Sequence, residues 1–259
     1  DFSAETGIRA EETDAYDLQG VSATASLSQP FNDHFTLSAG ATIDATRSTD
    51  YELRSAGQDE YVEQVTLSFP LGATYDTVKQ PLDPQAGNRI ALGVEPGVSV
   101  GDSEAPFTRI TTSASTYRKI TDRLVAAVRA EAGTFLGDDD VPVDRKFYAG
   151  GGGSVRGFEY QSLSPTDTDG NIIGGDAMFA ASAELRFRHS DRWGYVAFVD
   201  SGYAAGSIDE AISEMRMSAG FGIRFYPGFG PIRFDVATPL DRQEGEDPVQ
   251  IYVSIGQAF

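Results

Sequence analysis

Apolar and polar residues alternate one by one along much of the second half of the chain. The clearest run alternates Met215, Met217, Ala219, Phe221, Ile223 and Phe225 with Arg216, Ser218, Gly220, Gly222 and Arg224. Successive side chains of a β-strand point to opposite faces, so this run predicts a strand with one apolar and one polar face. A soluble β-sandwich would bury the apolar face, whereas a membrane barrel would turn it to lipid and leave the arginines in a wet lumen.

The same alternation predicts about twelve strands in all. Five follow residue 165, at 179–187, 193–204, 215–225, 232–237 and 249–256. About seven precede it, at 1–10, 19–30, 34–47, 61–76, 88–101, 106–119 and 122–136. Short connections alternate with long acidic ones, at 46–60, 137–144 and 241–247, as in barrels with two different ends. We therefore expect one all-β domain, an antiparallel transmembrane β-barrel.

Composition narrows the functions that this fold can serve. The chain carries 39 acidic and 20 basic side chains, a net charge of -19, which disfavours binding to nucleic acid or to an anionic surface. It has no cysteine, and its two histidines, His34 and His189, have no partner at ligand spacing. The acidic run 138–140 indicates a solvated loop, and 167–171 matches only part of a calcium loop. We expect no metal, no cofactor and no enzymatic activity.

Residues 147–165 form the most informative segment, FYAGGGGSVRGFEYQSLSP. Its centre consists of Gly150, Gly151, Gly152, Gly153, Ser154, Val155, Arg156, Gly157 and Phe158. Glycines let a backbone fold tightly or enter a narrow space, and an arginine presents a fixed fork of donors that suits a buried carboxylate. The segment lacks the lysine of a phosphate loop and the G-x-S-x-G pattern of a nucleophile elbow. It is either a loop that carries Arg156 to a partner or a flexible surface linker.

This loop resembles the signature loop of the bacterial surface antigen superfamily of outer-membrane assembly barrels, with Val155–Phe158 as its most specific part. The likeness continues through 145–259, where 198–202, 220–224 and 230–235 fall in the family's order. Within the superfamily the chain is most similar to the barrel subunits of the translocation and assembly module, the TamA-like branch. The central barrels of the general assembly machine and the two-partner secretion transporters share the arginine loop and remain alternatives.

The resemblance implies a barrel of sixteen strands with the loop after the eleventh and folded into the lumen. Residues 1–259 would then be the C-terminal barrel domain, without about four first strands and without the N-terminal POTRA domains. Arg156 would anchor the loop, and Asp200 and Asp235 are the candidate partners on the lumen wall. The residues support Asp235 independently, because it shares the polar face of its strand with Arg233.

The last strand contains a second candidate signal, formed by Tyr252, Gly256 and Phe259. Counting in steps of two places Phe259 in the apolar row of Val249, Ile251, Val253 and Ile255. We therefore expect Phe259 to face lipid, like the aromatic end of related outer-membrane barrels that the assembly machinery reads. An ordinary residue of an aromatic girdle is the alternative interpretation.

By this resemblance the chain is a barrel of the bacterial outer membrane that helps insert or export outer-membrane proteins such as autotransporters. Its expected partners are the lipid bilayer, client proteins and, through the absent N-terminal domains, a TamB-like periplasmic protein. A passive pore or two-partner-secretion-type transporter is the first alternative, and a soluble β-sandwich is the second.

Overall fold

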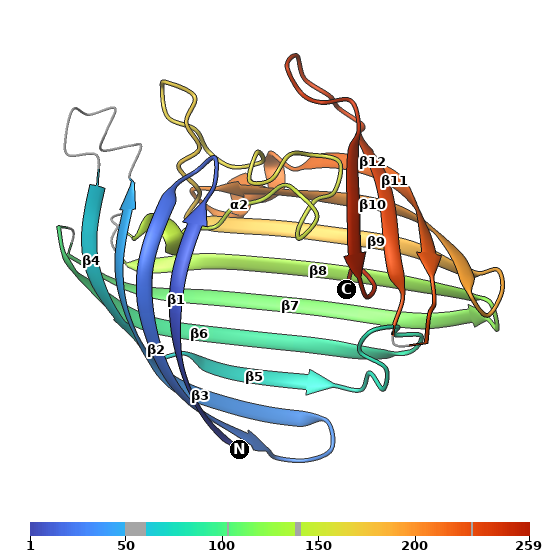
Figure 1. Ribbon diagram of the computed structural model, residues 1–259, viewed down its shortest axis with the longest axis horizontal. Helices are drawn as coiled ribbons and strands as arrows, with labels where there is room; N and C mark the ends of the chain where they lie inside the picture. The colour runs from blue at the N-terminus through green and yellow to red at the C-terminus, as the bar shows by residue number, and fades with distance from the viewer. Residues whose placement is uncertain (50–60, 103, 138–140, 229) are drawn as a thin grey trace.

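In the described residues, thirteen strands form a single antiparallel sheet, and strands that follow one another in the chain lie side by side except at β4 and β5 (Figure 1). This computed structural model describes residues 1–49, 61–102, 104–137, 141–228 and 230–259. The strands are β1 (Phe2–Glu12), β2 (Asp17–Pro30), β3 (Phe35–Thr49), β4 (Tyr61–Ser68), β5 (Leu71–Asp76), β6 (Gly87–Gly101), β7 (Ala105–Thr121), β8 (Leu124–Gly137), β9 (Ala177–Arg188), β10 (Trp193–Ala205), β11 (Arg216–Phe225), β12 (Ile232–Pro239) and β13 (Gln250–Ile255). Two short helices, η1 (Val143–Arg145) and α2 (Ile208–Ser213), are the other elements of the described residues.

Strands β4 and β5 occupy one position in the sheet, because both pair with β3 on one side and β6 on the other. Pro70, which has no N–H to donate to a ladder, separates them. The thirteen strands therefore fill twelve positions, five of them after the loop, which confirms the predicted all-β barrel. The predicted acidic run 138–140, and residues 50–60 of the predicted acidic connection 46–60, lie outside the described residues.

The two faces of the sheet are inverted relative to a soluble protein. Leu185 and Ile251 are 53% and 61% exposed on the outer face, whereas Arg224 and Asp235 are 0% exposed on the inner face. An apolar outer surface around a charged interior is the arrangement of a membrane barrel. The soluble β-sandwich is therefore wrong, because its apolar rows would be buried.

The two ends of the sheet differ as the connection lengths predicted. At one end, which we call the short-turn end, tight connections at 31–34, 122–123 and 189–192 join successive strands. Aromatic pairs gather there, such as Trp193 with Phe225, whose ring centroids lie 5.0 Å apart. The opposite, long-loop end carries the β8–β9 connection, part of which lies inside the curve of the sheet in Figure 1. Among the described residues, no helix has both the length and the apolar character needed to cross a membrane.

Both edge strands of the sheet are paired on one side only within the described residues, since no ladder joins β1 to β13. β1 is exposed on both of its faces along most of its length. An unpaired edge strand presents a row of free N–H and C=O groups to which another strand can add. The sheet therefore has two such edges, one from each end of the strand order.

Candidate functional site

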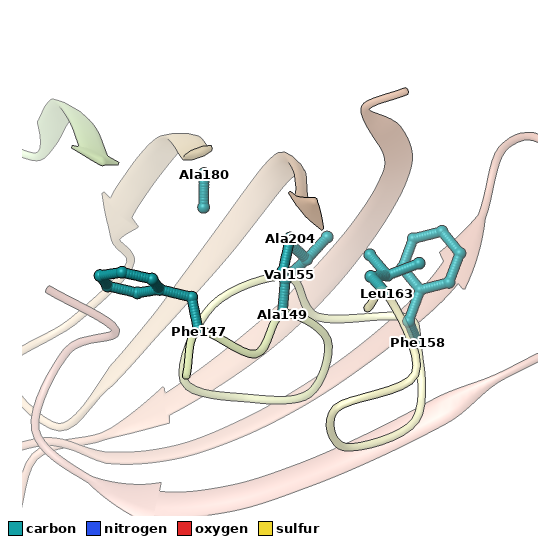
Figure 2. Close-up of a cluster of buried hydrophobic side chains, with 7 residues drawn as sticks. All are labelled: Phe147, Ala149, Val155, Phe158, Leu163, Ala180 and Ala204. Atoms are coloured by element: carbon teal, nitrogen blue, oxygen red, sulfur yellow. The ribbon is translucent and has the colours of Figure 1, made fainter. Parts of the chain in front are cut away.

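The loop at 147–165 is packed into the lumen around an apolar cluster. Figure 2 shows Phe147 at one end, Phe158 with Leu163 at the other, and Ala149, Val155 and Ala204 between them. Leu163 N donates to Ala149 O and Ala204 N donates to Leu163 O, both at 2.9 Å, so the loop is also tied to β10. Val155 is 0% exposed. The flexible surface linker is therefore wrong.

Glycines are required in this loop for two different reasons. Gly150 and Gly157 have φ angles of 106° and 98°, which other residues adopt only at a cost in strain. A Cβ on Gly157 would also lie 2.7 Å from Ser218 Cβ, and one on Gly152 would lie 2.9 Å from the Tyr252 ring. Gly153 differs, because a Cβ there would meet nothing within 4 Å.

The guanidinium of Arg156 reaches three carboxylates on three different strands. Its Nε and Nη2 donate to the two oxygens of Asp200 at 2.7 and 3.0 Å, a bidentate contact. Its Nη1 donates to Asp235 Oδ2 at 3.0 Å, and Nη2 lies 2.8 Å from Glu184 Oε1. The guanidinium also stacks on Phe198, with Cζ 3.4 Å from the ring centroid. The structure thus brings Arg156 together with both candidate partners and with Glu184, which the sequence analysis had not proposed.

Backbone contacts hold the same part of the loop. The Arg156 N–H donates to Asp200 Oδ2 at 3.2 Å, and the Ser218 hydroxyl donates to Arg156 O. The Tyr252 hydroxyl accepts from Gly157 N and donates to Phe158 O, both at 3.0 Å. Tyr252 lies on the inner face of β13, so its contact is with the loop rather than with lipid.

The carboxylates around Arg156 each have a second partner. Arg186 Nε donates to Glu184 Oε2 at 2.7 Å, Arg224 pairs with both oxygens of Asp235, and the Ser182 hydroxyl donates to Asp200 Oδ1 at 2.5 Å. Three arginines thus balance three carboxylates in a buried, charge-neutral set. We call these six residues the lumen cluster: Arg156, Glu184, Arg186, Asp200, Arg224 and Asp235.

Burial of Arg156 by itself acts to lower its pKa. The hydrogen bonds that Arg156 donates to Asp200 and the charges of Glu184, Asp200 and Asp235 outweigh burial, so the pKa of Arg156 lies above the ordinary arginine value. Removing one member of such a set leaves a buried charge without its partner, which is costly even where the intact pair contributes little net stability. The lumen cluster therefore holds the loop in one docked position.

The end of the chain departs from its predicted position. β13 ends at Ile255, and Gly256, with a φ of 93°, turns the backbone away from the ladder. The Phe259 ring then lies 6.2 Å from Tyr117 and 5.1 Å from the Arg186 guanidinium, both on the inner face. The prediction that Phe259 faces lipid is wrong, because the period of two holds only while the strand continues.

A second arginine of the same connection is docked on the opposite wall. Arg145, in η1, donates from Nη1 to Glu95 Oε1 of β6 at 3.0 Å and from Nη2 to Asp44 of β3. Sequence reasoning missed Arg145, because no motif marks it. It also missed Glu184, Arg186 and Arg224, although all three fall on predicted polar faces, which was the available signal.

Chemically, the lumen cluster is arranged for binding the loop. Its charged groups are directed at one another, and no group of three or more His, Cys, Asp or Glu side chains among the described residues is placed to hold a metal ion. His34 and His189 lie in connections at the short-turn end, exposed and apart from the lumen cluster.

An apolar outer wall, a charged lumen and an inward-docked arginine loop together define an outer-membrane β-barrel with an occupied lumen. The sequence profile of the Omp85 superfamily domain matches residues 2–259. The chain therefore belongs to the Omp85 superfamily, which also includes the TamA-like barrels, and the predicted superfamily is confirmed. Its location is the bacterial outer membrane.

Two curated relatives are outer membrane protein assembly factors named BamA. The protein from Nitratidesulfovibrio vulgaris is 26% identical over 271 residues, which cover 100% of this chain and 34% of the relative. The protein from Neisseria meningitidis serogroup B is 27% identical over 162 residues, which cover 49% of this chain and 20% of the relative. The chain thus spans about a third of the length of the first relative and a fifth of the second.

Solved structures show the same fold. BamA from Haemophilus ducreyi lacking POTRA domains 1-3 superposes with a TM-score of 0.77 at 19% identity, over 98% of this chain and 59% of that one. CdiB from Acinetobacter baumannii superposes with a TM-score of 0.63 at 15% identity, over 98% of this chain and 46% of that one. At these identities the likeness concerns the architecture of the barrel.

Proposed function

We propose that this chain is the barrel of a factor that inserts or exports outer-membrane proteins. The observation that carries the proposal is the loop docked in the lumen through Arg156, combined with two unpaired edge strands, β1 and β13. An edge strand can add to the strand of a client by β-augmentation. The work is then done by strand exchange and barrel shape, without a cofactor or a catalytic group.

Within the superfamily we propose the TamA-like branch, on the resemblance that runs through 145–259 and includes the motifs at 198–202, 220–224 and 230–235. Clients would include autotransporters, and a TamB-like periplasmic protein would be the partner. We also propose that the parent protein has POTRA domains and about four further strands before β1, which agrees with the 59% of the Haemophilus ducreyi barrel chain that this chain covers. The BamA relatives make the general assembly barrels the second candidate branch.

A transporter of the two-partner secretion type is the alternative function, and the likeness to CdiB favours it. A passive pore is less compatible with the structure. The loop packs in the lumen through its apolar cluster and its ion pairs with the wall, whereas a pore needs a hydrated path.

The full-length parent in proteoliposomes provides the test. Two urea-unfolded clients, an autotransporter barrel and a small eight-stranded barrel, are added, and the folded, protease-resistant fraction of each is measured. We expect folding of the autotransporter with the parent protein, a strong loss with Arg156→Ala, and little change with Arg242→Ala, an exposed arginine at the long-loop end. Equal folding of both clients would favour a general assembly barrel. Ion conductance without any folding of clients would refute the assembly function.

A charge reversal adds a test of loop docking within the same assay. Asp200 contacts one arginine of the lumen cluster, Arg156, whereas Asp235 contacts both Arg156 and Arg224. Arg156→Asp combined with Asp200→Arg should therefore regain more assembly activity than Arg156→Asp with Asp235→Arg. No recovery with either pair would argue against loop docking as the basis of activity.

A further inference from the structure

The residues after β13 leave the sheet and turn into the lumen. We call residues 256–259 the tail. The ladder between β12 and β13 ends with the pair Ile232 and Ile255, after which Gly256 N donates to Pro231 O at 2.7 Å. Had the strand continued, the register would place Phe259 on the outer face. Instead the tail turns into the lumen, where Phe259 meets Tyr117.

The β5–β6 connection holds the tail from one side. Gln257 N donates to Leu82 O at 3.2 Å, and Gln257 Nε2 donates to Asp83 Oδ1 at 2.9 Å. Pro84, which is fully buried, offers its carbonyl to Arg186 Nη1 at 3.5 Å. A connection between strands far from β13 in the sheet thus reaches across the short-turn end to the tail.

The lumen cluster holds the tail from the other side by two routes that meet at Arg156. Along the first route, Arg186 Nη2 donates to Phe259 O at 3.0 Å, Arg186 pairs with Glu184, and Glu184 pairs with Arg156. Along the second route, Arg224 Nε donates to Gln257 Oε1 at 2.9 Å, and Arg224 pairs with Asp235, which pairs with Arg156. Loop and tail therefore bind opposite sides of one set of charges.

We propose that docking of the arginine loop and docking of the tail are positively coupled through this set, with Glu184 and Arg186 as positioning residues. The tail orients Arg186 and Arg224, and these two arginines fix the carboxylates that receive Arg156. When the tail leaves, both arginines lose a partner on one side and the carboxylates lose their fixed orientation. Because coupling is reciprocal, release of the loop loosens the tail by the same factor.

The coupling has a consequence for the edge of the sheet. A released tail can continue β13 with Phe259 facing outward, which lengthens the edge available to an incoming strand. Release of the loop would then expose more of the pairing edge. This consequence rests on the proposed function, but the coupling itself does not, and it is measured without any client.

Labelling rates of a single cysteine test the coupling in the full-length protein in detergent micelles. The natural chain has no cysteine, so Val155→Cys reports loop release at a buried position. We expect Gln257→Leu with Phe259→Ala to accelerate maleimide labelling at Val155→Cys by about tenfold, within the range of roughly 5–150-fold that is usual for coupled sites. The matched control is Ile251→Ala with Val253→Ala, two outward-facing residues of β13, with a change of under about twofold. Gly153→Cys, already exposed, corrects for intrinsic reactivity.

Two further labelling experiments test whether the coupling runs through Glu184 and whether it also acts from the loop to the tail. In a Glu184→Gln background the tail changes should accelerate labelling clearly less, because the first route is broken. In the reverse direction, Arg156→Ala should accelerate labelling at Ala258→Cys by a similar factor, and this arm does not depend on folding of the Glu184 variant. Unchanged labelling at Val155→Cys in the tail variant, or equal acceleration by the outward-facing control, would overturn the coupling. Because no client is present, either result leaves the assembly function to its own assay.

Discussion

Arg156 and Arg145 belong to the same connection and dock on opposite walls of the barrel, yet they are docked differently. The side chain of Arg156 is 3% exposed and meets carboxylates of β9, β10 and β12, whereas that of Arg145 is 16% exposed and meets Asp44 of β3 and Glu95 of β6. Arg156 has an aromatic ring beneath it as well. The connection therefore spans the lumen from Arg156, which is almost fully buried, to Arg145, which is partly exposed to solvent.

The charges around the two anchors are balanced to different degrees. The pKa of Arg156 is raised, so its partners more than offset the effect of burial. Beside Arg145, burial raises the pKa of Asp144 even though Arg145 and Arg9 act to lower it. A buried acid whose pKa is raised in the folded state makes the folded protein less stable as the pH rises through that raised pKa. Because Arg145 is more exposed than Arg156 and meets two carboxylates of the barrel wall where Arg156 meets three, we expect the connection to release at Arg145 first.

The largest expected effect is that of Arg156→Ala. It leaves three buried carboxylates short of a partner, so we expect the barrel to lose about 3–5 kcal/mol of stability and the loop to become cleavable at 150–153. The loss of stability is measured by urea titration, with the folded fraction read from the difference in gel mobility between heated and unheated samples. Limited proteolysis measures cleavage at 150–153. Arg242→Ala is the matched arginine control. A midpoint equal to that of the control would mean that the lumen cluster does not hold the loop.

Arg145→Ala should have a smaller effect, about 1.5–3 kcal/mol, because hydrogen bonds from one charged group to Asp44 and Glu95 are lost at a less buried site. We expect cleavage to appear near 141–147 while 150–153 stays protected. The same proteolysis assay reads this difference. Simultaneous loss of protection at both places would show that the two anchors act as one unit.

Gly157→Ala and Gly153→Ala form a matched pair in the same loop. Alanine at Gly157 must adopt a positive φ and press on Ser218, so we expect a loss of about 1–3 kcal/mol. Alanine at Gly153 meets open space at an ordinary φ and should be nearly neutral. The urea midpoints of unfolding of the two variants measure this difference in stability. Equal midpoints would contradict the close approach of the loop to β11.

The smallest expected effect is that of Tyr252→Phe, which removes one hydroxyl that bonds Gly157 N and Phe158 O. We expect a loss of about 0.5–1.5 kcal/mol and faster labelling at Val155→Cys. Tyr195→Phe, an outward-facing tyrosine of β10, is the control. A loss no larger than the control's would show that β13 contributes little to loop docking.

Much of this architecture could be predicted from the sequence, because it depends on neighbours along the chain. Alternation predicted twelve strand positions and the polar face that carries Arg224 and Asp235, since the period of two is a property of each strand alone. The glycine run and Arg156 marked the loop, since positive φ angles and a forked cation are local features. Pro70, which interrupts the strand predicted at 61–76, was a local signal that the prediction did not use.

The resemblance proposed Asp200 and Asp235 as partners of Arg156, whereas the other charged contacts were decided by the tertiary structure alone. Glu184, Asp200 and Asp235 lie on strands that become neighbours only through the register of the sheet, and Arg145 finds Asp44 about a hundred residues away across the lumen. The inward position of Phe259 could not be predicted for the same reason. The alternation of faces applies only up to Gly256, where the backbone leaves the ladder, and the contacts of Phe259 with Tyr117 and Arg186 lie in the lumen. Local alternation determines the faces of a strand, whereas the partners of a buried charge are determined by distant segments that folding brings together.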